Sequence, residues 1–300
     1  MQLLRGRTHG VNWLVVSPDS RYVAAGGGRC HLWDLAAAEL KARTPDNPGD
    51  FATGMTFPAP AVFTTWGGNQ LRRYDLNAGT DRVYSLPRVD SFRGAIVHPS
   101  GDSMKAWGPS GGVIVNVTIT ADGLETVESE RLPTSPVLVA FSPDGNRYLC
   151  RDSYPADPRR RYHLRDHVTD EVVATFEEPE SMHSEYYWTH QWLFTPDSRR
   201  LIALNRHVAA YDCASGGLPV AEYLATSVGK VSAMAAHPDG RRVATVEDHR
   251  TVTLRDADSF APLRSYDFAM PKVTCVAFTP DGTRCAVGNS RGKVLLFDVD

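Results

Sequence analysis

The 300-residue sequence lacks the features of a secreted or membrane-spanning chain. Its first residues, Met-Gln-Leu-Leu-Arg-Gly-Arg, contain no apolar core of a signal peptide, and no run of about 18 apolar residues occurs anywhere. Cysteine is scarce, with five residues and no C-x-x-C spacing, which disfavours both disulfide and zinc frameworks. We therefore expect a cytoplasmic protein whose cysteines are reduced.

An excess of charge of one sign is also missing. The formal net charge is −3, so we expect neither nucleic acid nor a membrane surface as a partner. The sequence contains no G-x-G-x-x-G, no G-x-x-x-x-G-K-[ST], no H-E-x-x-H and no EF-hand loop. Neither a cofactor nor a metal ion is expected.

One catalytic pattern, G-x-S-x-G, does occur twice, at Gly108–Gly112 and at Gly288–Gly292. A nucleophilic serine in this pattern stands on a turn between a strand and a helix. Here each match is followed by residues typical of a strand, so Ser110 and Ser290 are interpreted as turn residues. The ten histidines are scattered, and the spacing of His183 and His190 suits no common metal site. No catalytic residue is predicted.

What the sequence does contain is a repeat, and residues 273–300 carry its clearest copy. Apolar periodicity predicts three short strands, at residues 273–278, 283–287 and 293–297. Pro280, Asp281 and Gly282 form the first tight turn, and Gly288 to Gly292 form the second. The third strand, Val-Leu-Leu-Phe, is apolar on both faces, so we expect it to be covered on both sides.

The turn proline recurs along the whole chain and marks seven units. Successive turn prolines are 40 to 53 residues apart, a period typical of repeat folds. The third predicted strand of most units ends in aspartate, which suits a structural role in a turn better than a single active site. The prolines are Pro18, Pro58, Pro99, Pro143, Pro196, Pro238 and Pro280, and the aspartates are Asp34, Asp75, Asp166, Asp212, Asp256 and Asp298.

These features resemble the WD40 repeat family, of which the chain is identified as a divergent member. Trp33-Asp34 is the only literal W-D pair, and His9-Gly10 is a reversed trace of the family's G-H signature. The family's Asp-His-Ser/Thr-Trp hydrogen-bond network is incomplete in every unit, although Asp248 occupies the position of its aspartate. The resemblance implies an all-β fold: a seven-bladed β-propeller of four-stranded antiparallel blades, built as one domain over residues 1–300.

The two ends of the chain predict how the last blade is completed. Unit seven ends after its third strand, while residues 2–5 form a short apolar segment ahead of unit one. We expect residues 2–5 to supply the missing outer strand of the last blade, because this pairing hides an aggregation-prone edge.

The resemblance implies a non-enzymatic interaction scaffold that docks a protein or peptide partner on its rim loops, and we expect a monomer. The alternative is a propeller hydrolase or lactonase with a metal in its central channel, since a fold does not dictate a function. The loops that enter the first strands are poor in carboxylates, which favours the scaffold.

Two insertions predict where a partner binds. One lies between the second and third strands of unit four, and the other connects units four and five; Arg, Tyr and Trp in them are typical of interface hot spots. In the competing interpretation the aromatic residues fill the gap between blades, and the acidic residues 177–180 neutralise the arginines. The predicted binding residues are Arg159, Arg160, Arg161, Tyr186, Tyr187, Trp188 and His190, with the turns at Arg206, Arg250 and Arg291 as the other basic candidates.

Overall fold

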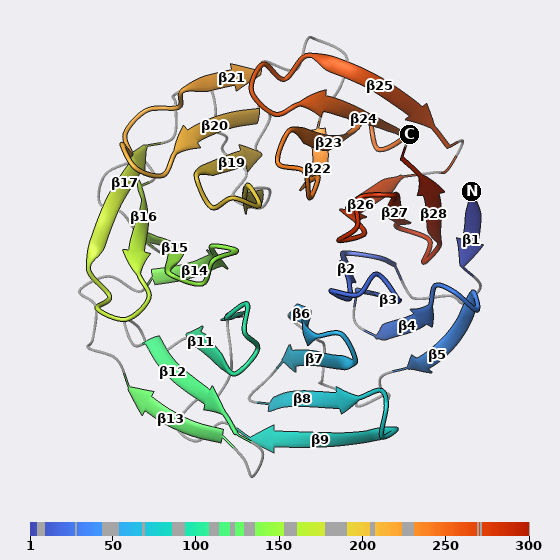
Figure 1. Ribbon diagram of the computed structural model, residues 1–300, viewed down its shortest axis with the longest axis horizontal. Helices are drawn as coiled ribbons and strands as arrows, with labels where there is room; N and C mark the ends of the chain where they lie inside the picture. The colour runs from blue at the N-terminus through green and yellow to red at the C-terminus, as the bar shows by residue number, and fades with distance from the viewer. Residues whose placement is uncertain are drawn as a thin grey trace. The chain divides into compact units, whose positions relative to one another are not determined.

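The computed structural model describes residues 1–4, 10–27, 29–43, 54–67, 70–85, 94–107, 114–120, 124–128, 136–152, 161–177, 191–204, 208–223, 231–268, 270 and 272–299. Every regular element in these ranges is a β-strand, and the strands form seven four-stranded sheets. The chain divides into two compact units, Met1–Asp46 with Pro179–Asp300, and Asn47–Glu178. The first unit holds four sheets and the second holds three (Figure 1).

The first unit contains blades one, five, six and seven, numbered after the sequence repeats that supply them. Within each blade, neighbouring strands are antiparallel and follow chain order, except that the first strand of the chain joins blade seven. The strands are β2 (Trp13–Val16), β3 (Tyr22–Gly26), β4 (Cys30–Asp34) and β5 (Glu39–Arg43); β18 (Gln191–Phe194), β19 (Arg200–Leu204), β20 (Val208–Asp212) and β21 (Ala221–Tyr223); β22 (Val231–Ala236), β23 (Arg242–Glu247), β24 (Thr251–Asp256) and β25 (Pro262–Asp267); and β26 (Val273–Phe278), β27 (Arg284–Asn289), β28 (Val294–Asp298) and β1 (Gln2–Leu4).

The second unit contains blades two, three and four, and each of them is an antiparallel meander. The strands are β6 (Gly54–Ala59), β7 (Val62–Gly67), β8 (Gln70–Asp75) and β9 (Thr80–Ser85); β10 (Gly94–Val97), β11 (Ser103–Trp107), β12 (Ile114–Ile119) and β13 (Leu124–Glu128); and β14 (Pro136–Phe141), β15 (Arg147–Asp152), β16 (Arg161–Asp166) and β17 (Val172–Glu177).

Blade seven is completed from the opposite end of the chain. β1 pairs antiparallel with β28, with Leu3 opposite Leu295 and Leu4 opposite Val294. Leu4 is 2% exposed and packs in a cluster with Val294 and residues of blade one. The predicted closure is therefore confirmed for residues 2–4, and Arg5 lies outside the described residues.

The third strand of blade seven is covered on both faces, as its composition predicts. Val294 to Phe297 on β28 are all buried. Their side chains alternate between two clusters, one shared with blade six and the other with blade one. A strand in such a place cannot present a polar face, because neither of its faces meets water.

The boundary of β27 differs from the sequence-based expectation, which ended the strand at Val287. Gly288 and Asn289 extend it, because Gly288 pairs with Val294 and Asn289 pairs with Val273. A Cβ added at Gly288 would lie 2.5 Å from Val11 Cγ1, so the close packing there favours glycine. Asn289 then accepts hydrogen bonds from the backbone N–H groups of Arg291 and Lys293, at 3.0 and 2.9 Å. The turn is thus shorter than predicted, and β28 begins one residue later.

Four of the seven proline turns share one hydrogen-bond pattern. The residue before proline donates its hydroxyl to the aspartate two positions later, at 2.6 Å in each case, and the residue after that aspartate has positive φ. A side chain that bonds its own turn favours the turn over extended structure. The hydroxyl–aspartate pairs are Ser17–Asp19, Ser142–Asp144, Thr195–Asp197 and Thr279–Asp281.

A buried charge joins blades three and four in the second unit. Lys105 on β11 is 1% exposed, and its ammonium donates to Asp170 Oδ1 and Asn116 Oδ1, both at 2.8 Å. Tyr148 donates its hydroxyl to the same oxygen of Asp170 at 2.9 Å. Burial and the adjacent carboxylate raise the pKa of Tyr148, so its hydroxyl remains a donor.

In blade six a buried arginine is the centre of a polar network. This network stands where the family's Asp-His-Ser/Thr-Trp network is incomplete. Arg255, at the position of the W-D tryptophan, bonds Glu247 Oε1 through Nη2 at 2.6 Å and Thr245 Oγ1 through Nε at 3.2 Å. Its Nη1 donates to the carbonyl of Phe260 at 2.8 Å. Asp248, the expected acidic member, has positive φ in the adjoining turn, and Glu247 makes the contact instead.

Candidate interaction surface

Most of the predicted partner-binding residues lie outside the described part of the chain. Trp192, which adjoins the second insertion and was expected in the core, is 6% exposed on β18, which confirms that expectation. Arg161, Arg250 and Arg291 are the candidates that the structure places. The candidates outside the described residues are Arg159, Arg160, Tyr186, Tyr187, Trp188, His190 and Arg206.

Arg161 lies at the start of β16, opposite Glu177 at the end of β17. Its Nε is 3.8 Å from Glu177 Oε1, and both side chains are partly exposed. The start of β16, where the first insertion ends, and the end of β17, where the second insertion begins, therefore lie side by side on one edge of blade four. The same contact supports the interpretation in which acidic residues near Glu177 offset part of the arginine charge, although an exposed pair stabilises by about 1 kcal/mol at most.

Arg250 and Arg291 lie in the first unit, in the turns between the second and third strands of blades six and seven. Backbone hydrogen bonds join these turns to one another and to blade one. Val273 N donates to His249 O at 2.6 Å, and Ser290 N donates to Lys272 O at 3.0 Å. Val11 N in turn donates to Asn289 O at 3.0 Å. The turns form one continuous edge, which we call the basic edge.

Positive charge predominates on the basic edge. Six basic residues lie there against two acidic ones, and one of the acids, Asp267, is paired with Arg250 at 2.8 Å. The bond to Asp267 raises the pKa of Arg250, so the guanidinium stays charged. All eight residues are exposed. The basic residues are Arg29, Arg43, Arg250, Lys272, Arg291 and Lys293, and the acidic residues are Asp248 and Asp267.

Three residues of the basic edge have left-handed backbone conformations that are rare without glycine. Asp248, His249 and Lys272 have φ of 51°, 56° and 50°. Residues in this region cost of order 1 kcal/mol each and tend to cluster at functional sites. Here the hydrogen bond from Val273 N to His249 O holds the two strained segments together.

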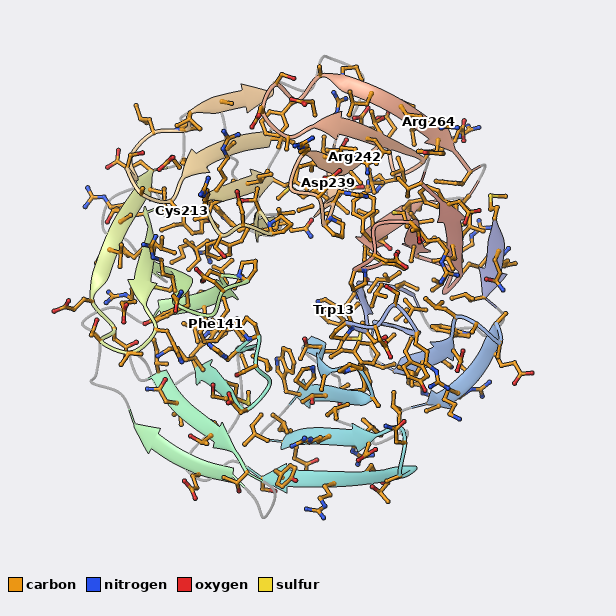
Figure 2. All side chains as sticks on the ribbon, viewed as in Figure 1. Trp13, Phe141, Cys213, Asp239, Arg242 and Arg264 are labelled. Carbon is orange, nitrogen blue, oxygen red and sulfur yellow. The ribbon has the colours of Figure 1, made fainter. Side chains whose placement is uncertain are left out.

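The opposite edge of blades six, seven and one carries the opposite charge. It contains the proline turns and the turns that follow the third strands, with six exposed acidic residues against two exposed basic ones. Asp239 and Arg242 pair there at 2.8 Å and lie side by side in Figure 2. The exposed acidic residues are Asp19, Glu39, Asp239, Asp258, Asp281 and Asp298, and the exposed basic residues are Arg21 and Arg241; Asp34, Asp256, Arg242 and Arg284 lie there too but are buried or half-buried.

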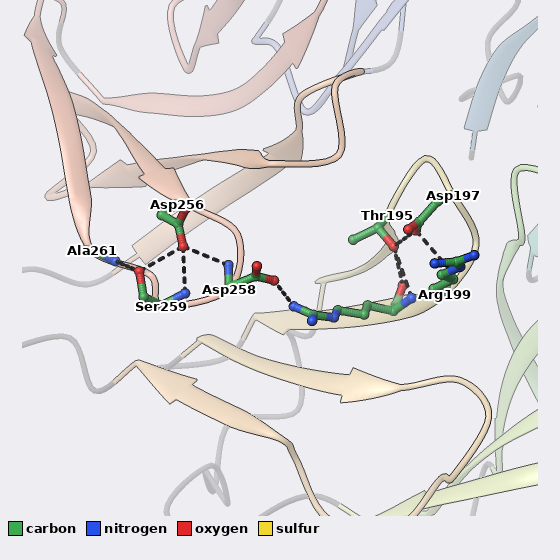
Figure 3. A network of polar contacts seen from close by, with 8 residues as sticks. Thr195, Asp197, Arg199, Asp256, Asp258, Ser259 and Ala261 are labelled. Carbon is green, nitrogen blue, oxygen red and sulfur yellow. Dashed lines mark hydrogen bonds and ion pairs between the residues drawn. The ribbon is translucent and has the colours of Figure 1, made fainter.

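The aspartates that end the third strands are turn residues, as their recurrence predicts. Asp256 Oδ1 accepts the backbone N–H groups of Asp258 and Ser259, at 3.1 and 2.8 Å, and these bonds lower the pKa of Asp256. Figure 3 shows this turn. Arg200 of blade five also contacts Asp258. The same pair of backbone bonds recurs at Asp34, Asp75, Asp166 and Asp212.

One of the two G-x-S-x-G matches lies in the described residues. Ser290 lies in the turn between β27 and β28, with a strand on either side, and Ser110 lies outside the described residues. Within the described ranges no group of three or more His, Cys, Asp or Glu could hold a metal ion. The same ranges contain no helix long and apolar enough to cross a membrane.

Sequence reasoning found two described members of the basic edge and missed the others. Lys272, Lys293, Arg29 and Arg43 stand alone in the sequence and form no charge run. Their position in the repeat could have predicted them. Each lies next to a turn between the second and third strands, or next to the connection to the following blade.

Comparison with known proteins identifies the type of fold. Residues 1–34 and 262–298 match the family model "WD domain, G-beta repeat". No curated protein matches the sequence. Among solved structures, the β-propeller domain of Myceliophteria thermophila Cps50 (Swd1) is similar over 100% of this chain and 99% of its own, with a TM-score of 0.77 and 14% identity.

A second similar structure is a chain of the Mitotic Checkpoint Complex, with a TM-score of 0.71 and 12% identity over 99% of this chain and 89% of that one. At such low identity these likenesses concern the fold. Together with the seven described sheets and the family match in the first and last blades, they confirm the expected architecture. The chain is a seven-bladed β-propeller, and its first and last repeats match the WD40 family model.

Proposed function

We propose that this propeller is a non-enzymatic scaffold that docks a protein or peptide partner on the loops at one edge of its blades. The main support for this proposal is the basic edge. There, turns from three blades are joined by backbone hydrogen bonds and present exposed charged side chains. Rigid strands with variable loops suit recognition. Similar propellers include a chain of a multiprotein complex, which supports a protein partner.

The predicted binding residues belong to two kinds of connection in the repeat. Arg159 and Arg160 and the turns at Arg206, Arg250 and Arg291 lie between second and third strands, and Arg161 begins the third strand of blade four. Tyr186 to His190 lie between blades four and five. Long loops in a compact repeat are more often functional than accidental. We therefore propose the insertions as a second candidate surface for a partner.

The test is affinity capture with the full chain, followed by reciprocal capture with the purified partner. Replacing Arg159 to Arg161 and Tyr187 with alanine should abolish capture while the melting temperature stays nearly unchanged. A variant with Arg82→Ala and Glu125→Ala, exposed positions on outer strands, serves as the control and should bind normally. Capture that survives the loop substitutions removes the insertions from the proposed surface.

The hydrolase or lactonase alternative is tested separately. A serine-directed fluorophosphonate probe should leave Ser110 and Ser290 unlabelled, and calorimetric titration with calcium or zinc should show no stoichiometric site. Labelling of either serine, or one tight metal site per chain, would replace the scaffold proposal with an enzymatic one.

A further inference from the structure

We propose that the basic edge of blades six, seven and one binds an acidic peptide segment of a partner protein, with Trp13 as its apolar anchor. This inference rests on the scaffold function proposed above and names the partner's chemistry. It depends on three observations: the charge difference between two edges of the same blades, the hydrogen-bonded backbone of the edge, and one exposed tryptophan beside it.

The charge difference decides which sign of partner is favoured. Among exposed residues, the basic edge has four more basic than acidic ones, whereas the opposite edge of the same three blades has four more acidic than basic ones. The chain as a whole carries a net charge of −3, so its total charge does not produce the positive edge. A field of this form attracts an acidic segment to one edge and repels it from the other.

The backbone of the basic edge is already ordered. Asn12 N donates to Gly26 O at 2.8 Å, which extends the chain of hydrogen bonds from blade seven into the turn that precedes Arg29. On the other side, Arg291 and Lys293 lie on a turn held by the side chain of Asn289. A partner therefore meets turns whose described backbone is already hydrogen-bonded, which lowers the entropic cost of ordering them on binding.

Trp13 supplies an apolar contact beside the charges. It is the first residue of β2, directly after Asn12, and it pairs with Gly26, the last residue of β3. Both residues therefore lie at the end of blade one that forms part of the basic edge. Its side chain is the one exposed Phe, Tyr or Trp in the described part of the chain, at 38% (Figure 2). Tryptophan at a rim of charge is typical of binding hot spots, because it buries a large area at low entropic cost.

The same features favour a peptide over a nucleic acid. Sequence-tolerant binding of single strands uses several aromatic rings on which successive bases stack, and the described residues of this edge offer one. Asp248 and Asp267 also interrupt the positive charges, and they would lie against a continuous phosphate backbone. A peptide can instead place a carboxylate at each basic residue and a neutral residue between them.

The experiment uses the full chain and an unbiased library of displayed random linear peptides. Selected peptides are synthesised with a fluorophore, and their dissociation constants are measured by anisotropy at about 50 and 300 mM salt. Two test variants are compared with the parent: Arg291→Glu with Lys293→Glu, and Trp13→Ser. The control, Arg241→Glu with Arg284→Glu, reverses two charges on the opposite edge.

We expect the selected peptides to be rich in Asp and Glu and to weaken by at least about tenfold at the higher salt. The charge-reversed basic edge should bind at least about tenfold more weakly, Trp13→Ser should also lose affinity, and the control should keep or increase affinity. Unchanged melting temperatures verify that all three variants are folded.

The failures are distinguishable. Peptides that are selected without acidic enrichment, or that bind the Arg291→Glu and Lys293→Glu variant normally, would overturn the acidic-segment inference and leave the scaffold proposal standing. Binding of a 20-nucleotide single-stranded oligonucleotide that outcompetes the peptides would assign the edge to nucleic acid and overturn the inference. A library that yields no peptide, together with an affinity capture that yields no partner, would overturn both proposals.

Discussion

The imidazole of His237 in blade six reaches across to blade seven and lies 3.0 Å from the backbone carbonyl of Gly282. The ring covers the glycine so closely that a Cβ added there would lie 2.7 Å from His237 Cε1. His98 makes the equivalent contact with Gly145, between blades three and four, at 3.1 Å. A histidine before the turn proline thus pairs with a glycine in the next proline turn.

Replacing Gly282 with alanine should lower the free energy of unfolding by roughly 3 kcal/mol, because positive φ strain and the clash with His237 add. Gly240 has the same φ of 71° and the same place in its turn, but nothing lies within 4 Å of an added Cβ. Gly240→Ala should therefore cost only about 1 kcal/mol. Urea unfolding of both variants checks the difference, and equal losses would show that the histidine contact contributes nothing.

Leu4 should be the residue through which β1 stabilises blade seven. It is 2% exposed, so Leu4→Ala should destabilise the protein by roughly 2 to 4 kcal/mol. Its neighbour Leu3 is 51% exposed, and Leu3→Ala should change stability by less than about 1 kcal/mol. Deleting residues 1–7 should lower the melting temperature further and promote aggregation, because the edge of β28 is then unpaired. A truncated chain that melts like the parent would contradict the closure.

Asp170 should be needed to keep the ammonium of Lys105 buried. Asp170→Asn removes the negative charge and tolerates the positive φ at this position, so it should cost roughly 3 kcal/mol by leaving a buried, uncompensated cation. Asp267→Asn breaks an exposed pair with Arg250 and should cost less than about 1 kcal/mol. Thermal unfolding at neutral pH compares the two, and similar melting temperatures would argue against the buried pair.

Stability should fall in acid partly through the aspartates that end the third strands. Hydrogen bonds from the backbone, at Ser259 and at Ser215 respectively, lower the pKa of Asp256 and Asp212. A carboxyl whose pKa is lower when folded stabilises the fold fully above its unfolded value of about 3.9, and this contribution is lost as pH falls through the folded value. Asp256→Asn keeps an acceptor but cannot titrate, so its urea midpoint should approach that of the parent between about pH 5 and pH 2. A gap that stays constant with pH would contradict this assignment.

The sequence by itself determined the elements and their number. The hydroxyl–Pro–Asp turns are local, because a side chain bonds the backbone and the aspartate of its own turn. Neighbouring residues in the sequence therefore suffice to predict them. The apolar third strand likewise reveals that both faces are covered. The pairing of β1 with β28 could also be predicted from the sequence. Unit seven lacks an outer strand, and residues 2–5 form an apolar segment that belongs to no other unit.

Only the tertiary structure decided which distant side chains meet. Lys105 and Asp170 lie 65 residues apart, and no local pattern specifies that their charges pair between blades three and four. The basic edge is similar: Arg250 and Arg291 were candidates from the sequence, but Lys272 and Arg29 join them only because backbone hydrogen bonds bring successive turns together. Those contacts depend on how each blade is packed against the next, and that packing depends on many small, non-local contacts that a single sequence does not display.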